Sequence, residues 1–234
     1  MKQKMIGIIG GMGPQASAEL YRLLIEGAKD HYGAKNNDEF PEILIDSVPV
    51  PDFLSDTNQM EKAAVMLEDR VRRMVIYGAS NVSVACNTAC VLSGRLQKQI
   101  SVPFISVVDE VAKKASVRHK HVLLLASPTS LRLGLYKKAL SRYGVLCVVP
   151  PKQYHQEIEN IIRGVIEGAE RSRLTEKLFR LTNNILTNEY VDGVVLGCTE
   201  LPLVFPENYR LPVYNSLSIL AESLLKRYYT KEDL

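Results

Sequence analysis

The chain has 234 residues, of which 46% are hydrophobic and 24% charged, with 14 glycines and 11 prolines. This composition is typical of a globular protein and excludes intrinsically disordered and fibrous classes. The net charge is only +3, from 29 basic and 26 acidic residues with no run of one sign, so we expect neither a nucleic acid nor a membrane surface as a partner.

Apolar runs of strand length alternate with longer helical patterns along the chain. The expected strands cover residues 5–9, 42–47, 81–85, 104–106, 121–126, 145–149, 193–196 and 213–215. The expected helices cover residues 16–32, 59–77, 91–99, 107–116, 131–143, 153–169, 173–189 and 216–229. Several strands are continuous Val/Ile/Leu runs, which is typical of parallel strands covered on both faces, and the alternation predicts a doubly wound α/β fold.

The apolar runs are also too short for other assignments. The first one stops at the glycine pair 10–11, so it predicts a first strand and not a signal peptide. No run approaches the about 18 residues that a membrane span requires.

A weak internal repeat divides the chain into two halves. Residues 6–14 (IGIIGGMGP) resemble residues 121–129 (HVLLLASPT), and residues 82–88 are echoed by residues 194–199. The matching positions lie about half a chain apart, and the alternative is a chance match of short apolar patterns. We predict two similar doubly wound α/β domains with mainly parallel sheets, related by a pseudo-twofold axis, with the active site in the cleft between them. The first domain is expected to comprise residues 1–107 and 213–234, and the second residues 108–212.

A glycine-rich loop from Gly10 to Pro14 follows the first expected strand and precedes a helix. This is where α/β folds bind ligands, at strand carboxyl ends and helix N-termini. A G-x-G-x-x-G fingerprint that begins at Gly11 would need a third glycine where Ala16 stands, and Asp46 is too far along the chain to bind a ribose. The glycines therefore indicate either turn geometry or ligand contacts.

The four cysteines are at positions 86, 90, 147 and 198. Because dense disulfide bonding belongs to short secreted chains, we expect free thiols in a reducing cytoplasm. Cys147 lies in an expected strand and is predicted to be core packing. Cys86 and Cys90 could form a redox or metal pair, but no neighbouring His or Cys completes a ligand set, so no metal is expected.

Cys86 and Cys198 stand at equivalent strand ends of the two halves. Each alone is more typical of an inert buried thiol, but the two ends would face each other across the cleft. A helix start after Cys86 would lower the thiol pKa from about 8.5 toward neutrality. A thiolate and a thiol on opposite sides of a ligand suit inversion at a carbon acid, because one removes the Cα proton and the other delivers a proton to the opposite face. Backbone N–H groups and the side chains of Asn87, Thr88 and Thr199 could stabilise the enolate-like intermediate.

Three motifs in this order and spacing resemble the aspartate/glutamate racemase family. They are residues 8–14 (IIGGMGP), 86–89 (CNTA) and 197–200 (GCTE), and the resemblance spans essentially the whole chain. It implies an amino-acid racemase that uses no cofactor, has two Rossmann-like domains and is usually a homodimer. By position, Cys86 and Cys198 match the two catalytic cysteines of the family. The substrate-contacting positions of the family match Met12, Gly13, Asn87, Thr88 and Thr199.

Three positions depart from the family pattern. Cys90 replaces a common His, which removes a possible helper of the first thiol. Phe53 and Glu170 replace an Arg and a Lys that bind the side-chain carboxylate in members acting on aspartate. An apolar or basic side chain is therefore expected to fit better than an acidic one, unless a residue such as Arg163 compensates.

Other activities keep the same fold. Related folds host decarboxylation, cis/trans isomerisation and hydantoin racemisation, although two cysteines favour racemisation because a decarboxylase needs only one proton donor. A non-catalytic module that senses an amino acid in the cleft is the alternative outside enzymology. Glu200 could orient or deprotonate Cys198, or it could cap a helix.

Overall fold

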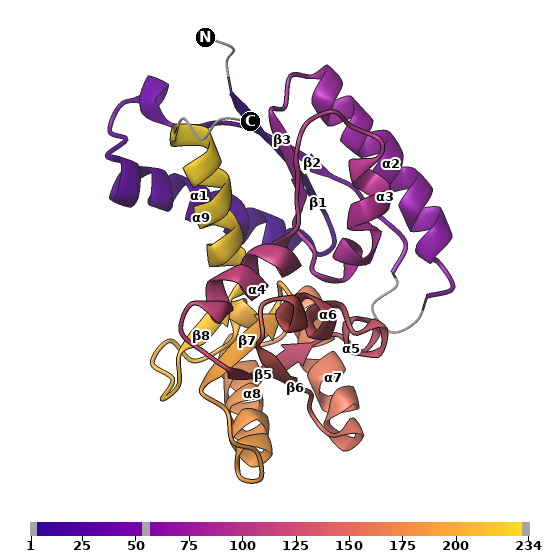
Figure 1. The fold of residues 1–234 in the computed structure, drawn as a ribbon, viewed down its shortest axis with the longest axis vertical. Helices are drawn as coiled ribbons and strands as arrows, with labels where there is room; N and C mark the ends of the chain where they lie inside the picture. Colours follow the sequence, from indigo (N-terminus) through magenta and orange to yellow (C-terminus); the bar gives the residue numbers. More distant parts are fainter. Residues whose placement is uncertain (1–3, 53–56, 231–234) are drawn as a thin grey trace.

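The structure, a computed structural model, describes residues 4–52 and 57–230 and divides into two α/β halves (Figure 1). Each half has a four-stranded sheet in which all neighbouring strands are parallel, with strand order β2-β1-β3-β4 in the first and β6-β5-β7-β8 in the second. The strands are β1 (Met5–Gly10), β2 (Glu42–Ser47), β3 (Asn81–Val84), β4 (Phe104–Ile105), β5 (His121–Ala126), β6 (Leu146–Val148), β7 (Gly193–Gly197) and β8 (Val213–Asn215). The equivalent strand orders confirm the prediction of two similar α/β domains with parallel sheets.

Helices flank both sheets. They are α1 (Pro14–Tyr32), α2 (Met60–Ile76), α3 (Ser93–Gln97), α4 (Val107–Ser116), α5 (Pro128–Leu133), α6 (Leu135–Arg142), α7 (His155–Ile166), α8 (Arg171–Leu186) and α9 (Ser216–Tyr229). The short 3-10 helices are η1 (Asn37–Glu39), η2 (Thr88–Leu92), η3 (Lys152–Tyr154) and η4 (Leu201–Leu203). Within the described ranges, no helix is long and apolar enough to cross a membrane.

The central strands are apolar on both faces because helices cover both. In β1, Ile8 packs into the cluster that contains α1 and α9, while the next residue, Ile9, packs into the cluster that contains α2. In β5, Leu124 joins the first of these clusters and Leu125 packs against α7 and α8. This alternation explains the continuous apolar runs in the sequence.

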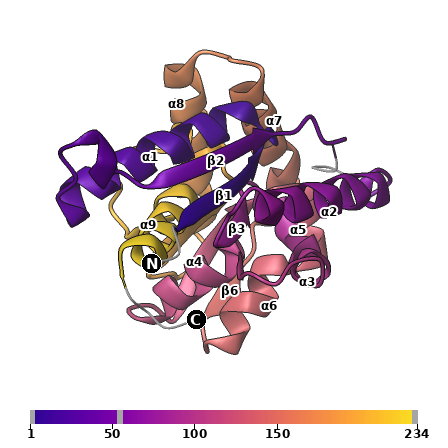
Figure 2. The same cartoon turned by 90° about the horizontal axis from the view of Figure 1, so that it is seen from above.

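One hydrophobic cluster joins the two halves. It contains Leu20 of α1, Val111 of α4, Leu220 of α9, Leu124 of β5 and Tyr136 of α6, all of them buried. Figure 2 shows α9 beside α1 and α4, in agreement with the packing of these helices against one another. Burial of this shared apolar surface holds the halves together, so the loops at the carboxyl ends of their sheets meet at one cleft.

The placement of the last strand differs from the prediction. Residues 213–215 were expected in the first domain, but β8 pairs with β7 in the second sheet, with Val194 opposite Val213, so this part of the prediction is wrong. The physical reason is the repeat itself, because β8 is the counterpart of β4 and completes the same four-stranded order. Helix α9 does pack against α1 of the first half.

Two expected helices are also altered. The helix expected over residues 131–143 starts earlier, at Pro128, and is interrupted by Gly134, whose φ of 64° ends α5. Ser127 caps its start, since Ser130 N donates to Ser127 Oγ at 3.2 Å. The helix expected over 91–99 begins as the 3-10 turn η2, with only residues 93–97 in α3.

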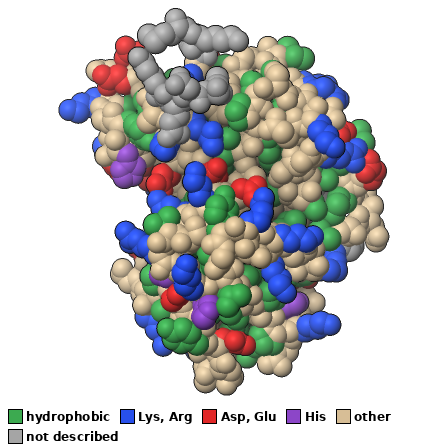
Figure 3. Space-filling model, in the orientation of Figure 1, with side chains coloured by type: hydrophobic (Ala, Val, Ile, Leu, Met, Phe, Trp, Pro, Cys, Tyr) green, Lys and Arg blue, Asp and Glu red, His purple; other side chains and the backbone are tan. Residues whose placement is uncertain are grey.

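The visible surface carries interspersed charges. On the face in Figure 3, basic and acidic side chains are scattered among apolar and polar ones. This distribution agrees with the small net charge.

Candidate active site

Loops from both halves enclose a cavity of about 280 Å³. The lining residues from the first half are Gly11, Met12, Gly13, Pro14, Val50, Pro51, Asp52, Cys86 and Thr88. Those from the second half are Arg163, Ile166, Cys198 and Glu200. The cavity therefore lies between the halves, where the sequence pattern places the site.

The loop after β1 is held in a conformation that requires glycine. Gly11 has a φ of 90°, and a Cβ there would lie 2.5 Å from the backbone oxygen of Val48. Ser17 of α1 fixes the loop, because its Oγ accepts from Gly11 N at 3.0 Å and donates to Gly13 O at 3.2 Å. The loop thus serves turn geometry at Gly11 and lines the cavity as well.

Cys86 is buried at the end of the first-half sheet and lines the cavity. Burial, with the nearby negative charge of Glu200, raises its pKa to about 12, although the backbone N–H groups of Thr88 and Ala89 oppose this shift. The prediction that the helix start brings this pKa toward neutrality is wrong, because desolvation outweighs two N–H donors. The two N–H groups reduce the cost of forming a thiolate at Cys86 without removing it.

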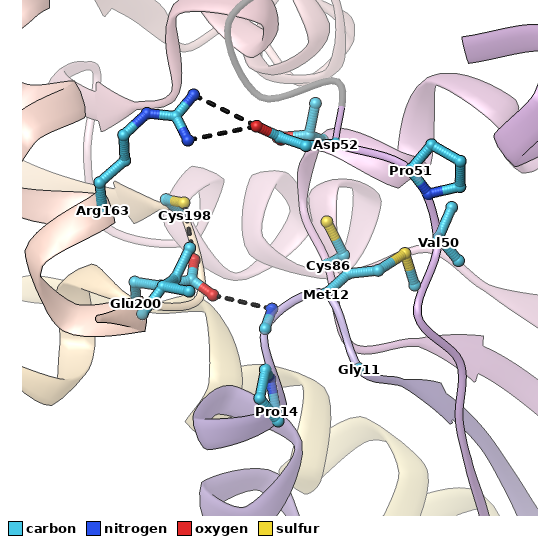
Figure 4. Close-up of a pocket in the computed structure, with 13 residues that line it drawn as sticks. Gly11, Met12, Pro14, Val50, Pro51, Asp52, Cys86, Arg163, Cys198 and Glu200 are labelled. Carbon is cyan, nitrogen blue, oxygen red and sulfur yellow. Dashed lines mark hydrogen bonds and ion pairs between the residues drawn. The ribbon is translucent and has the colours of Figure 1, made fainter. Parts of the chain in front are cut away.

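Cys198 faces a buried carboxylate. Its Sγ donates to Glu200 Oε2 at 2.9 Å, and Thr199 Oγ1 donates to the same oxygen at 3.1 Å. The other oxygen, Oε1, accepts from Gly13 N at 3.1 Å across the cleft (Figure 4). Burial and the charge of Glu200 raise the pKa of Cys198 well above its ordinary value. Cys198 is therefore held as a thiol that points its proton at Glu200.

The predicted substrate-contacting residues do not all reach the cavity. Met12, Gly13 and Thr88 line it, and Thr88 Oγ1 lies 2.8 Å from Ser127 Oγ. Asn87 lies behind the lining, where it accepts from the Tyr136 hydroxyl and donates to Ser216 Oγ at 3.1 Å. Thr199 also lies outside the lining, and its hydroxyl donates a hydrogen bond to Glu200.

An ion pair spans the cleft, above the two thiols in the view of Figure 4. Arg163 of α7 donates from Nη1 and Nη2 to Asp52 Oδ2 at 3.2 Å each. The sequence pattern points to Arg163 only as a compensating cation and does not single out Asp52. The available signal for Asp52 is its place after the end of the second expected strand, whereas Arg163 sits inside a helix, where only the tertiary structure reveals its direction.

The remaining predictions concern residues outside the cavity lining. Cys90 is half-buried and its Sγ lies 3.7 Å from Cys86 O, while Cys147 packs against the shared core, as predicted. Phe53 falls outside the described residues. Glu170 is exposed beside the start of α8 and does not line the cavity, so the expectation that it disfavours an acidic side chain has no structural support.

The described part of the chain holds neither a group of side chains that could bind a metal ion nor a disulfide bond. No group of three or more His, Cys, Asp and Glu side chains there could hold a metal ion. The four cysteines are free. The site therefore defines a class of protein in which two half-repeats each contribute one thiol to a shared cleft.

The comparisons with known proteins agree with this class. The model of the Asp/Glu/hydantoin racemase family matches residues 9–224, and the chain belongs to this family. The broad-specificity amino-acid racemase RacX of Bacillus subtilis is 26% identical over 228 residues, which cover 96% of this chain and 98% of that protein.

Solved structures show the same architecture over nearly the whole chain. An aspartate racemase homologue from Pyrococcus horikoshii has a TM-score of 0.81 at 28% identity, covering 98% of this chain and 100% of that one. The aspartate racemase of Picrophilus torridus has a TM-score of 0.81 at 25% identity, covering 96% and 94%. The family resemblance predicted from three motifs is confirmed, and with it the assignment to the racemases, which are isomerases.

Proposed function

We propose that this protein inverts the Cα of a free amino acid without a cofactor, using Cys86 and Cys198 as its two acid/base groups. The observation that carries the proposal is the cavity itself, which one thiol enters from each half of the molecule. Membership of the racemase family and the likeness to a broad-specificity racemase support it.

The surroundings of the thiols suggest a division of labour. The N–H groups of Thr88 and Ala89 favour a thiolate on Cys86, whereas Glu200 holds the proton of Cys198. In one direction, the Cys86 thiolate takes the Cα proton and the Cys198 thiol delivers its own proton to the opposite face. After this step Cys86 is a thiol and Cys198 is a thiolate. The enzyme in this protonation state accepts the opposite enantiomer.

High thiol pKa values have two consequences for this reaction. Each thiolate is a strong base, which suits a weakly acidic Cα proton, but it is scarce at neutral pH. Glu200 adds to that scarcity at Cys198, because its negative charge, 2.9 Å from Cys198 Sγ, opposes a thiolate there. Thr88, whose hydroxyl lies in the cavity wall, is the side chain that we assign to the enolate-like carboxylate.

The substrate class is a small α-amino acid, either aspartate or glutamate or a broader set. A thiol pair of this kind works only while reduced, so we place the protein in the cytoplasm. We also propose a homodimer, on the family resemblance, and a first domain of residues 1–107 that is completed by α9.

Deuterium exchange at Cα tests the proposal directly. The protein is incubated in heavy water with single enantiomers of acidic, basic and neutral amino acids, and exchange and inversion are followed by NMR and chiral chromatography. We expect inversion of at least one amino acid, lowered about 100-fold or more by Cys86→Ser and by Cys198→Ser. Cys147→Ser is the matched control, because Cys147 lies outside the cavity lining. A panel without exchange contradicts the proposal, as does undiminished activity in either cavity variant.

A further inference from the structure

The ion pair between Asp52 and Arg163 lines the same cavity as the two thiols. Figure 4 shows the two thiols between this pair and the hydrogen bond from Gly13 to Glu200. If Cα sits between the thiols, its substituents extend toward these two contacts. A substrate side chain that extends away from the Gly13–Glu200 hydrogen bond therefore meets the charges of Asp52 and Arg163.

This ion pair is weak enough to be exchanged. The Arg163 and Asp52 side chains are 38% and 60% exposed, and water screens an ion pair of this kind strongly. A charged group that enters the cavity replaces one such contact with another. The displaced protein group turns to water, so the exchange carries little penalty.

Arg163 is oriented for this exchange by a second carboxylate. Its Nε donates to Glu159 Oε1 at 2.8 Å, one turn earlier on α7, and the Glu159 side chain is only 13% exposed. The guanidinium therefore keeps its place when Asp52 moves. Its Nη1 and Nη2 already hold the Asp52 carboxylate, which occupies the position that a carboxylate of a ligand would take.

We infer that Asp52 and Arg163 select the charged side chain of the amino-acid substrate by exchange of partners, so that acidic and basic amino acids both fit. This inference rests on the proposed function and adds its substrate class. An acidic side chain takes the place of Asp52 on Arg163. A basic side chain pairs with Asp52 when that carboxylate turns away from Arg163, while Glu159 keeps the arginine paired.

Removing the charge of Asp52 or of Arg163 distinguishes the binding of acidic substrates from that of basic ones. We would measure kcat/KM of the full chain for racemisation of glutamate, lysine and alanine. Asp52→Asn removes the charge that competes with an acidic ligand for Arg163 and that would bind a basic one, so the ratio of glutamate to lysine turnover should rise about fivefold or more. Arg163→Gln should lower the same ratio by a similar factor, and alanine should change less than either charged substrate in both variants.

Matched controls come from an ion pair on α2. Asp69→Asn and Arg73→Gln break a surface pair of 2.9 Å whose residues do not line the cavity, and the ratio should stay at its wild-type value in both. A ratio that moves in the same direction in the Asp52 and Arg163 variants, or does not move, overturns the inference. If the wild type racemises none of the three amino acids or the wider panel, the proposed function itself fails, which is a different result.

Discussion

Replacing Glu200 with glutamine removes a negative charge from between the two halves and keeps the size of the side chain. Glu200 Oε2 lies 2.9 Å from Cys198 Sγ, and its charge is a cause of the raised pKa of both cavity thiols. Coulomb's law at about 3 Å and an effective dielectric constant of about 20 bounds the repulsion of a Cys198 thiolate at roughly 5 kcal/mol. Neighbouring charges in proteins typically move a pKa by about one to three pH units.

The sign of the effect follows from the charge. Without the carboxylate, the Cys198 thiolate is easier to form, so its pKa falls and its population rises about tenfold for each pH unit of that fall. A less basic thiolate is also a weaker nucleophile, by about threefold per unit. The net expectation is that alkylation of Cys198 becomes about threefold faster or more, with a smaller gain at Cys86, which makes no side-chain hydrogen bond to Glu200 among the described contacts.

Alkylation by iodoacetamide at pH 8, resolved by site with mass spectrometry, measures this change. The matched control is Glu222→Gln, because Glu222 pairs with Lys114 on the surface at 2.7 Å. An alkylation rate at Cys198 that is unchanged or lower in Glu200→Gln would refute the reasoning. It would mean that the carboxyl group is uncharged beside the thiol or does not control its ionisation.

Two further predictions concern stability and use chemical denaturation with urea. Gly11→Ala should lower the free energy of unfolding by more than about 2 kcal/mol, since positive φ and the 2.5 Å approach to the Val48 oxygen both oppose a Cβ. Gly33→Ala, at a φ of 75° with open space around it, should cost only about 1 to 2 kcal/mol, and equal costs would contradict the steric argument. Burial raises the pKa of Cys147 from 9.0 to about 12, so its protonated thiol stabilises the fold fully below pH 9. The free energy of unfolding should therefore fall as pH rises from about 9 to about 12, and less steeply in Cys147→Ala. Parallel curves for the two proteins would contradict this role of Cys147.

Much of the fold can be predicted from local patterns because parallel strands covered on both faces leave continuous apolar runs. The half-chain repeat, from residues 6–14 and 121–129, predicts two similar sheets, and the structure has them in the same strand order. The sequence of residues 213–215 does not by itself show that they continue this repeat as the counterpart of β4. A strand of three residues carries too little pattern to show which sheet edge it joins, and only its ladder with β7 decides this.

The candidate site divides along the same line. The sequence by itself determined the two cavity thiols, Cys86 and Cys198, because each follows a buried strand at equivalent places of a repeat. Only the tertiary structure decided that Asn87 lies behind the lining and that Arg163 meets Asp52 across the cleft. It also decided the thiol pKa values, since desolvation and the charge of Glu200 outweigh the local effect of a helix start. Strand ends are encoded locally, whereas burial and contacts between the halves arise only when residues more than a hundred positions apart come together.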